Sequence, residues 1–215
     1  MTVTIAEELL LLALSEDKGK PLVGGTQLDP ALAGAILGEL AIAGRVELSD
    51  KKLTVKDPAP LGDEELDAAL ALIAEGKERA PAHWVQKLQS HKLRERLLSR
   101  LAAAGVLSEE RGKVLGIFPV SRWPEANPGV EADVRERVSA VLMGAAPDAR
   151  TAALIAITHA AGLTRKVFPD ADKKRVKEIA EGAWAADAVA KTIASIHAIA
   201  ATVATTAAIT TVTTT

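Results

Sequence analysis

Cysteine is absent from the 215-residue chain, so neither a disulfide nor a thiolate metal site can form. A reducing compartment is consistent with that absence. The phosphate-binding patterns GxGxxG and GxxxxGK[ST] are also missing, and the pairs Gly24-Gly25 and Gly34-Gly38 fit a loop and close helix packing better than a phosphate cradle. The sequence therefore gives no sign of thiol chemistry or of a nucleotide site.

Side chains that bind metals or act as acids and bases do not cluster in the sequence. The four histidines, at positions 83, 91, 159 and 197, have no partner at a ligand spacing such as H-x-x-x-H. His159 is better explained as a packed side chain than as a ligand. The acidic run that begins at Asp63 lies at a helix start, where carboxylates favour the helix dipole. We expect no catalytic residue, no metal and no cofactor.

The overall charge of the chain is close to zero, with 26 Lys and Arg against 28 Asp and Glu. Attraction to nucleic acid or to anionic lipid must then come from a local patch and not from the field of the whole protein. Glu7 and Glu8 occupy the place where a secretory leader would be apolar, so we expect a cytoplasmic protein.

Apolar patterns of helical period dominate the chain. Residues 148–163 follow an N-cap at Asp148 and are apolar on every face, which predicts a central buried helix. A helix over 4–15 begins with a capping box formed by Thr4 and Glu7. Another helix is expected from Asp29 to Gly44, with Asp29 as the N-cap and Pro30 as the first helical residue.

Two stretches combine a helix that ends in Ala-Gly with a β-hairpin. Alternating residues around Ser49-Asp50-Lys51 predict the first hairpin, and LAAAGVLSEERGKVLGI repeats the pattern of LAIAGRVELSDKKLTVK. Further helices are expected over 63–75, from Pro81 to Leu101, over 131–143 and between 170 and 199. The predicted fold is mainly α, a single globular domain over 1–200 with short β-hairpins, followed by a frayed Ala/Thr-rich tail at 201–215.

The stretch SHKLRERLLSR is the first candidate for binding. As a helix it places His91 and Arg94 on a basic side, while leucines occupy the opposite side. An ordinary solvated helix face is the alternative.

The stretch FPVSRWP is the second candidate for binding. Trp123 stands at a turn beside Arg122, where its ring can dock on lipid headgroups or on a partner. Alternatively, the ring folds back onto the hairpin and covers the core. Sequence alone favours neither arrangement.

Five segments in this order resemble the Golgi phosphoprotein 3 family, including its bacterial members. They are TIAEELLLLALSEDKGK, GAILGELAIAGRVEL, KLRERLLSRLAAAGVL, VLGIFPVSRWPE and RTAALIAITHAAGL. The resemblance extends from about residue 4 to residue 189. It implies a mostly helical domain built around one buried helix and without enzyme activity.

The resemblance also implies a function at membranes. Eukaryotic members of this family bind phosphatidylinositol 4-phosphate, insert a hairpin into the cytoplasmic leaflet and hold the cytoplasmic tails of membrane proteins. His91 and Arg94 match headgroup-binding positions, whereas Gly24 and Ala33 replace the tryptophan and the second arginine of the family pocket. The segment with Phe118, Arg122 and Trp123 corresponds to the membrane-inserting hairpin, which can also join copies of the chain into a homo-oligomer.

From this resemblance we expect a cytoplasmic, peripheral membrane adaptor that binds anionic phospholipid. The repeated helix and hairpin leave one alternative, a winged-helix DNA-binding module. Its recognition helix in the first unit would span Asp29 to Ala43, which has no Arg, Lys, Asn or Gln for bases or phosphates. The helix of the second unit is basic enough, so the alternative stays open, although no nucleic acid is expected as a partner.

Overall fold

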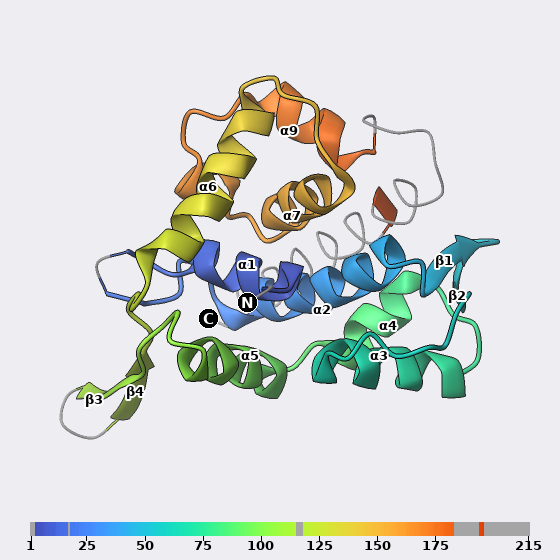
Figure 1. Ribbon diagram of the computed structural model, residues 1–215, viewed down its shortest axis with the longest axis horizontal. Coiled ribbons are helices and arrows are strands. Elements are labelled where there is room, and N and C mark those ends of the chain that lie inside the picture. Colours follow the sequence, from blue (N-terminus) through green and yellow to red (C-terminus); the bar gives the residue numbers. More distant parts are fainter. Residues whose placement is uncertain (1–2, 17, 115–117, 183–193, 196–215) are drawn as a thin grey trace, which may run out of the picture.

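A computed structural model of the chain describes residues 3–16, 18–114, 118–182 and 194–195 (Figure 1). The described part is mainly helical, as predicted, with two small antiparallel hairpins. Its elements are α1 (Ile5–Ala13), α2 (Gly25–Ile42), β1 (Val46–Ser49), β2 (Lys52–Val55), α3 (Glu64–Glu75), α4 (Pro81–Leu88), α5 (His91–Ala103), β3 (Glu110–Val114), β4 (Phe118–Arg122), α6 (Pro128–Leu142), α7 (Ala149–Ala160), α8 (Thr164–Val167) and α9 (Lys173–Ala180).

The helices form three layers (Figure 1). Helices α1 and α2 occupy the middle layer, with α3, α4 and α5 on one side and α6, α7 and α9 on the other. All nine residues of α1 are buried, and α7 is buried from Thr151 to Thr158, as its all-round apolar pattern predicts. The hydrophobic core therefore centres on α1, α2 and α7 together.

Local sequence signals set several helix starts. The capping box of α1 is present, because the Thr4 side chain accepts the Glu7 amide and the Glu7 side chain accepts the Thr4 amide. Asp148 caps α7 through its side chain, so the predicted caps at Thr4 and Asp148 are confirmed. Asp63, where the sequence indicated only a helix start, caps α3 in the same way.

Other helix boundaries differ from the prediction. Helix α2 begins at Gly25, so Pro30 lies inside the helix and Asp29 is not its N-cap. The earlier start buries Leu28 in the core, which offsets the backbone hydrogen bond that a proline inside a helix removes. The helix predicted from Pro81 to Leu101 is two helices, because Ser90 caps a new one by accepting the amide of Leu93.

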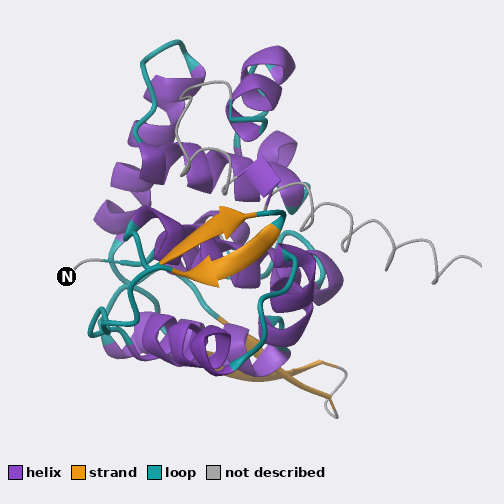
Figure 2. Ribbon diagram, turned by 90° about the vertical axis from the view of Figure 1, so that its right-hand side faces the viewer, coloured by secondary structure: helices purple, strands orange, loops and turns teal. Residues whose placement is uncertain are grey.

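Both predicted hairpins are present, at opposite ends of the long axis (Figures 1 and 2). In the first, Ser49 pairs with Lys52 around a turn in which Asp50 and Lys51 have φ of 46° and 62°. Positive φ at both central residues is the geometry of a type I′ turn, whose twist matches that of the strands. The tail at 201–215 and the chain from 183 to 193 lie outside the described residues.

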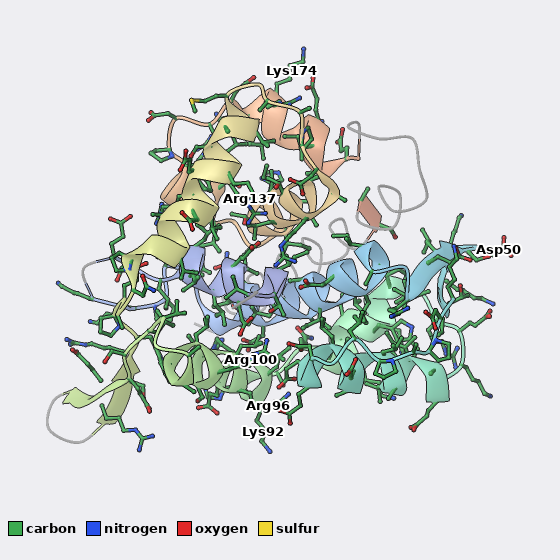
Figure 3. All side chains as sticks on the ribbon, viewed as in Figure 1. Asp50, Lys92, Arg96, Arg100, Arg137 and Lys174 are labelled. Carbon is green, nitrogen blue, oxygen red and sulfur yellow. The ribbon has the colours of Figure 1, made fainter. Side chains whose placement is uncertain are left out.

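Ion pairs between helices surround α1. Glu7 accepts Arg100 Nε at 2.7 Å, and Glu8 accepts Arg137 Nη2 at 2.7 Å and Arg150 Nε at 3.3 Å. Figure 3 shows Arg137 and Arg100 on either side of the α1 ribbon. Both glutamates are almost fully buried, so these arginines from α5, α6 and α7 compensate charges that water does not reach.

Candidate functional site

Arg94 belongs to α5, and its side chain reaches the first turns of α2. Its Nη1 atom donates to Asp29 Oδ1, and the two side chains are only 16% and 18% exposed. Burial raises the pKa of Asp29, while the positive charges of Arg94 and His91 oppose that rise. An anion that binds to Arg94 must therefore share or displace an existing carboxylate partner.

The first turn of α2 supplies the other half of this place. Gly24 is the N-cap, is exposed and has no side chain to cap the helix, so no N-cap side chain offsets the positive end of this 18-residue helix. A Cβ atom added to Gly25 would lie 2.7 Å from Arg94 Nη1, which shows how closely the guanidinium covers this turn. Gly24, Gly25, Asp29 and Arg94 together form what we call the α2 N-terminal site.

Two further positions lie near this site. Lys166 of α8 donates its Nζ to the carbonyl of Leu22 at 2.5 Å, just before α2 begins. His91, at the start of α5, is exposed and contacts Glu95 through Nδ1 at 3.3 Å. Ala33, at the second pocket position suggested by the resemblance, is fully buried in the core.

The remaining arginines of α5 are also paired with acids. Arg96 binds both carboxylate oxygens of Glu65, and Arg100 contacts Glu7 and Asp63. These carboxylates come from α1 and α3, or from the residue before α3, and not from α5 itself. Helical spacing within α5 could not reveal them, so the basic face is far less positive than the sequence indicates.

Trp123 follows β4 and is 7% exposed, with its backbone N–H donating to the carbonyl of Gly19 at 2.9 Å. Of the two arrangements that the sequence left open, the structure has the one in which the ring covers the core. Arg122 is exposed, whereas the side chain of Phe118 lies outside the described part. A buried Trp123 cannot insert into a membrane in this conformation.

The structure also bears on the DNA-binding alternative. Helix α2, which would have to enter a DNA groove, is buried from Leu28 to Ala41 apart from Asp29 and Glu39. A recognition helix must present its side chains to base edges, so α2 cannot act as one.

The described residues contain neither a metal-ligand cluster nor a membrane-spanning helix. No group of three or more His, Asp or Glu side chains there is arranged to hold a metal ion. In the same part of the chain, no helix has the length and apolar character needed to span a bilayer.

Comparison with known proteins identifies relatives over most of the chain. A protein from Eremothecium gossypii described as vacuolar protein sorting-associated protein 74 is 27% identical over 212 residues, which cover 81% of this chain and 64% of that protein. A protein of the same description from Schizosaccharomyces pombe is 26% identical over 163 residues, which cover 65% of this chain and 48% of that protein. The chain thus spans about half to two thirds of the length of these relatives.

The family model described as Golgi phosphoprotein 3 (GPP34) matches residues 5–196, from the first residue of α1 to beyond α9. This match confirms the family that the five segments indicated. The chain belongs to the Golgi phosphoprotein 3 family.

Proposed function

We propose that this protein is a non-catalytic, peripheral membrane adaptor that acts on the cytoplasmic face of a membrane. Its anion-binding element is the α2 N-terminal site, with His91 beside it, and its second membrane contact is the β3–β4 hairpin. The observation that carries the proposal is the position of the Arg94 guanidinium against Gly25, in the turn that begins at the exposed N-cap Gly24.

This pairing suits a phosphate group. Backbone N–H groups at a helix start and an arginine fork are the two donors that bind phosphate most often in proteins. Gly24 has no side chain and Ala33 has only a methyl group, so neither offers stacking surface or charge, and selectivity for phosphatidylinositol 4-phosphate over other anionic headgroups is weaker than in a complete pocket. Asp29 weakens the binding of an anionic headgroup further, because it already forms an ion pair with Arg94.

In this proposal the hairpin contributes through its exposed part and not through Trp123. Arg122 at the end of β4 is exposed and can meet anionic lipid, where a basic side chain contributes about 1 kcal/mol. The hairpin, with Phe118 in β4, is also the segment through which copies of the chain would associate. Cytoplasmic tails of membrane proteins are the proposed cargo of the adaptor.

Vesicle sedimentation tests the proposal with variants that act in opposite directions. Arg94→Gln removes the guanidinium and should lower binding to vesicles that contain phosphatidylserine, while neutral phosphatidylcholine vesicles bind neither protein. Asp29→Asn removes the competing charge and should raise binding. Binding should fade as salt exceeds physiological strength, where the Debye length falls below about 8 Å.

Lys92→Gln is the matched control, because Lys92 lies on α5 two residues before Arg94, is exposed, and lies outside the α2 N-terminal site. Equal losses for Lys92→Gln and Arg94→Gln would mean that only net charge matters, and the α2 N-terminal site would then be rejected. Equal recovery of the unmodified protein with neutral and anionic vesicles would reject the membrane function itself.

A further inference from the structure

A second place on the molecule has the character of a ligand site. A cavity of about 310 Å³ lies between the last turn of α7, helix α8 and the start of α9. Its wall includes Phe168, Pro169, Ala171 and Val176, and Val176 is 2% exposed. A mainly apolar wall with a few polar groups is typical of small-molecule sites, and this volume is at the lower end of their range.

Basic side chains form the rim of this cavity. They are Arg165, Lys173 and Lys177, and no carboxylate is among the described residues that line it. Lys177 contacts Glu181 at 3.7 Å, whereas Arg165 and Lys173 have no ion-pair partner in the described part of the chain. The rim therefore carries positive charge that the described structure does not neutralise.

Two more polar residues line the same cavity, Thr164 and His159. The Thr164 Oγ1 atom is itself buried, so a ligand in the cavity does not reach it. Burial lowers the pKa of His159, so its ring is neutral near pH 7 and the positive charge comes from the arginine and the lysines.

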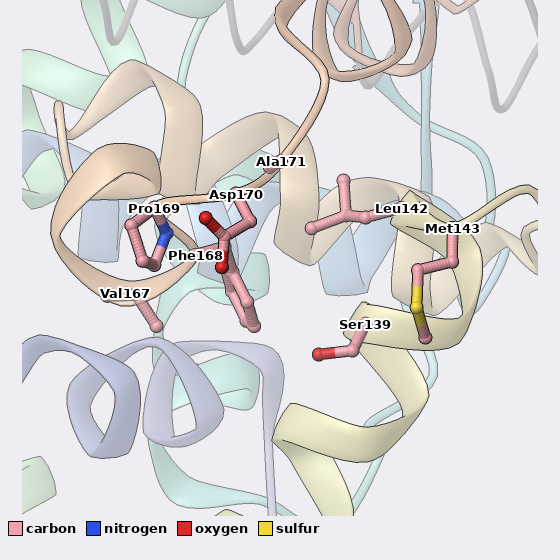
Figure 4. A pocket seen from close by; sticks show the side chains of 8 residues that line it. All are labelled: Ser139, Leu142, Met143, Val167, Phe168, Pro169, Asp170 and Ala171. Carbon is pink, nitrogen blue, oxygen red and sulfur yellow. The ribbon is translucent and has the colours of Figure 1, made fainter.

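The neighbouring cavity, of about 320 Å³, differs in charge. It shares Phe168, Pro169 and Ala171 with the first cavity, and Figure 4 shows this loop opposite Ser139 and Met143 of the α6 end. Its only charged lining residue among those described is Asp170. The loop from Phe168 to Ala171 thus separates an acidic cavity from a basic one.

We infer that the cavity between α7, α8 and α9 binds a small amphipathic anion. The phosphate or carboxylate head lies at Arg165 and Lys173, while a short alkyl chain packs on Phe168 and Ala171. Charge complementarity gives selectivity for an anionic head, and the apolar wall gives selectivity for an alkyl tail on the ligand. This site shares no residue with the α2 N-terminal site, so the inference goes beyond the proposed membrane function.

Calorimetric titration of the full chain with soluble single-chain probes tests the inference. Hexyl phosphate should bind, and inorganic phosphate and 1-hexanol should each bind at least about tenfold more weakly, because each lacks one of the two recognised groups. Equal affinity for inorganic phosphate would show a simple anion site, and equal affinity for hexanol an apolar void. Either result, or no binding of hexyl phosphate, overturns the inference.

Matched variants locate the binding. Lys173→Ala should weaken hexyl phosphate binding by about tenfold, the loss expected for one charge-assisted hydrogen bond. Lys174→Ala should leave it unchanged, because Lys174 is the next residue of α9, is 84% exposed and does not line the cavity. Equal effects of the two variants would refute the assignment.

One further comparison separates this site from the α2 N-terminal site. Lys173→Ala should bind phosphatidylserine vesicles as the unmodified protein does, which distinguishes failure of this site from failure of the proposed membrane function.

Discussion

Replacing Arg150 by methionine removes the charge that links α7 to the start of α1 and to α2. Arg150 donates to Glu39 at 2.6 Å, to Glu8 at 3.3 Å and to the carbonyl of Val3. Its side chain is 27% exposed, whereas Glu8 and Glu39 are 6% and 15% exposed. Methionine retains most of the apolar length of arginine, so the change tests the charge more than the packing.

The magnitude follows from burial. Removing one partner of a buried ion pair costs about 3–5 kcal/mol, because the other charge is left in a poorly solvated place. Glu8 keeps Arg137 at 2.7 Å, and the partial exposure of Arg150 lowers the cost. We therefore expect Arg150→Met to lower the free energy of unfolding by about 2–3 kcal/mol.

Urea denaturation followed by circular dichroism measures this loss as a shift of the midpoint at constant m-value. Glu39→Gln, alone and combined with Arg150→Met, completes a double-mutant cycle, in which the pair should show a coupling of about 1 kcal/mol or more. Lys174→Met removes an exposed pair with Glu178 and should change stability by less than about 0.5 kcal/mol. Additive single effects, or equal losses in Arg150→Met and Lys174→Met, would refute the reasoning.

Three further predictions concern backbone contacts and pH. Gly25→Ala adds a methyl group 2.7 Å from Arg94 Nη1, so it should reduce binding to anionic vesicles while circular dichroism shows unchanged or slightly higher stability. In urea titrations, Gly19→Ala should lower the free energy of unfolding by at least about 2 kcal/mol more than Gly105→Ala does. Both glycines have positive φ, but only a Cβ atom at Gly19 would meet backbone, 2.1 Å from the carbonyl carbon of Trp123. Burial would raise the pKa of Asp148, but hydrogen bonds from Thr151 and from the Arg150 amide lower this pKa overall. The unmodified protein should therefore be more stable than Asp148→Asn by its full margin above pH 3.8, and this margin should disappear as the pH falls through the lowered pKa of the folded state. A stability difference that does not depend on pH would contradict the prediction.

Signals that operate within a few residues predicted much of the fold. The caps at Thr4 and Asp148 and the turn at Asp50-Lys51 depend on neighbouring side chains and backbone, so the sequence shows them directly. The all-round apolar pattern of α7 was equally visible. The start of α2 was misplaced because a local preference for proline at a helix start yields to the burial of Leu28 in the core.

The candidate site was harder to predict because its electrostatics come from distant parts of the chain. Asp29 is 65 residues from Arg94, and Glu65 is 31 residues from Arg96. A helical pattern shows which face of α5 is basic but not which acids other helices bring to that face. Trp123 was undetermined for a similar reason, since its burial depends on the loop that contains Gly19.

The burial of α1 has a consequence for the order of events during protein synthesis. Arg100, the partner of Glu7, is synthesised 93 residues after it, and Arg150, a partner of Glu8, is synthesised 142 residues after it. At about 5–20 residues per second a ribosome needs roughly 7–28 s to supply the latter. During that interval the leucine-rich α1 segment, which is fully buried in the folded protein, lacks some of its packing partners. Chaperones that bind exposed apolar segments of nascent chains should therefore bind it most readily at this stage.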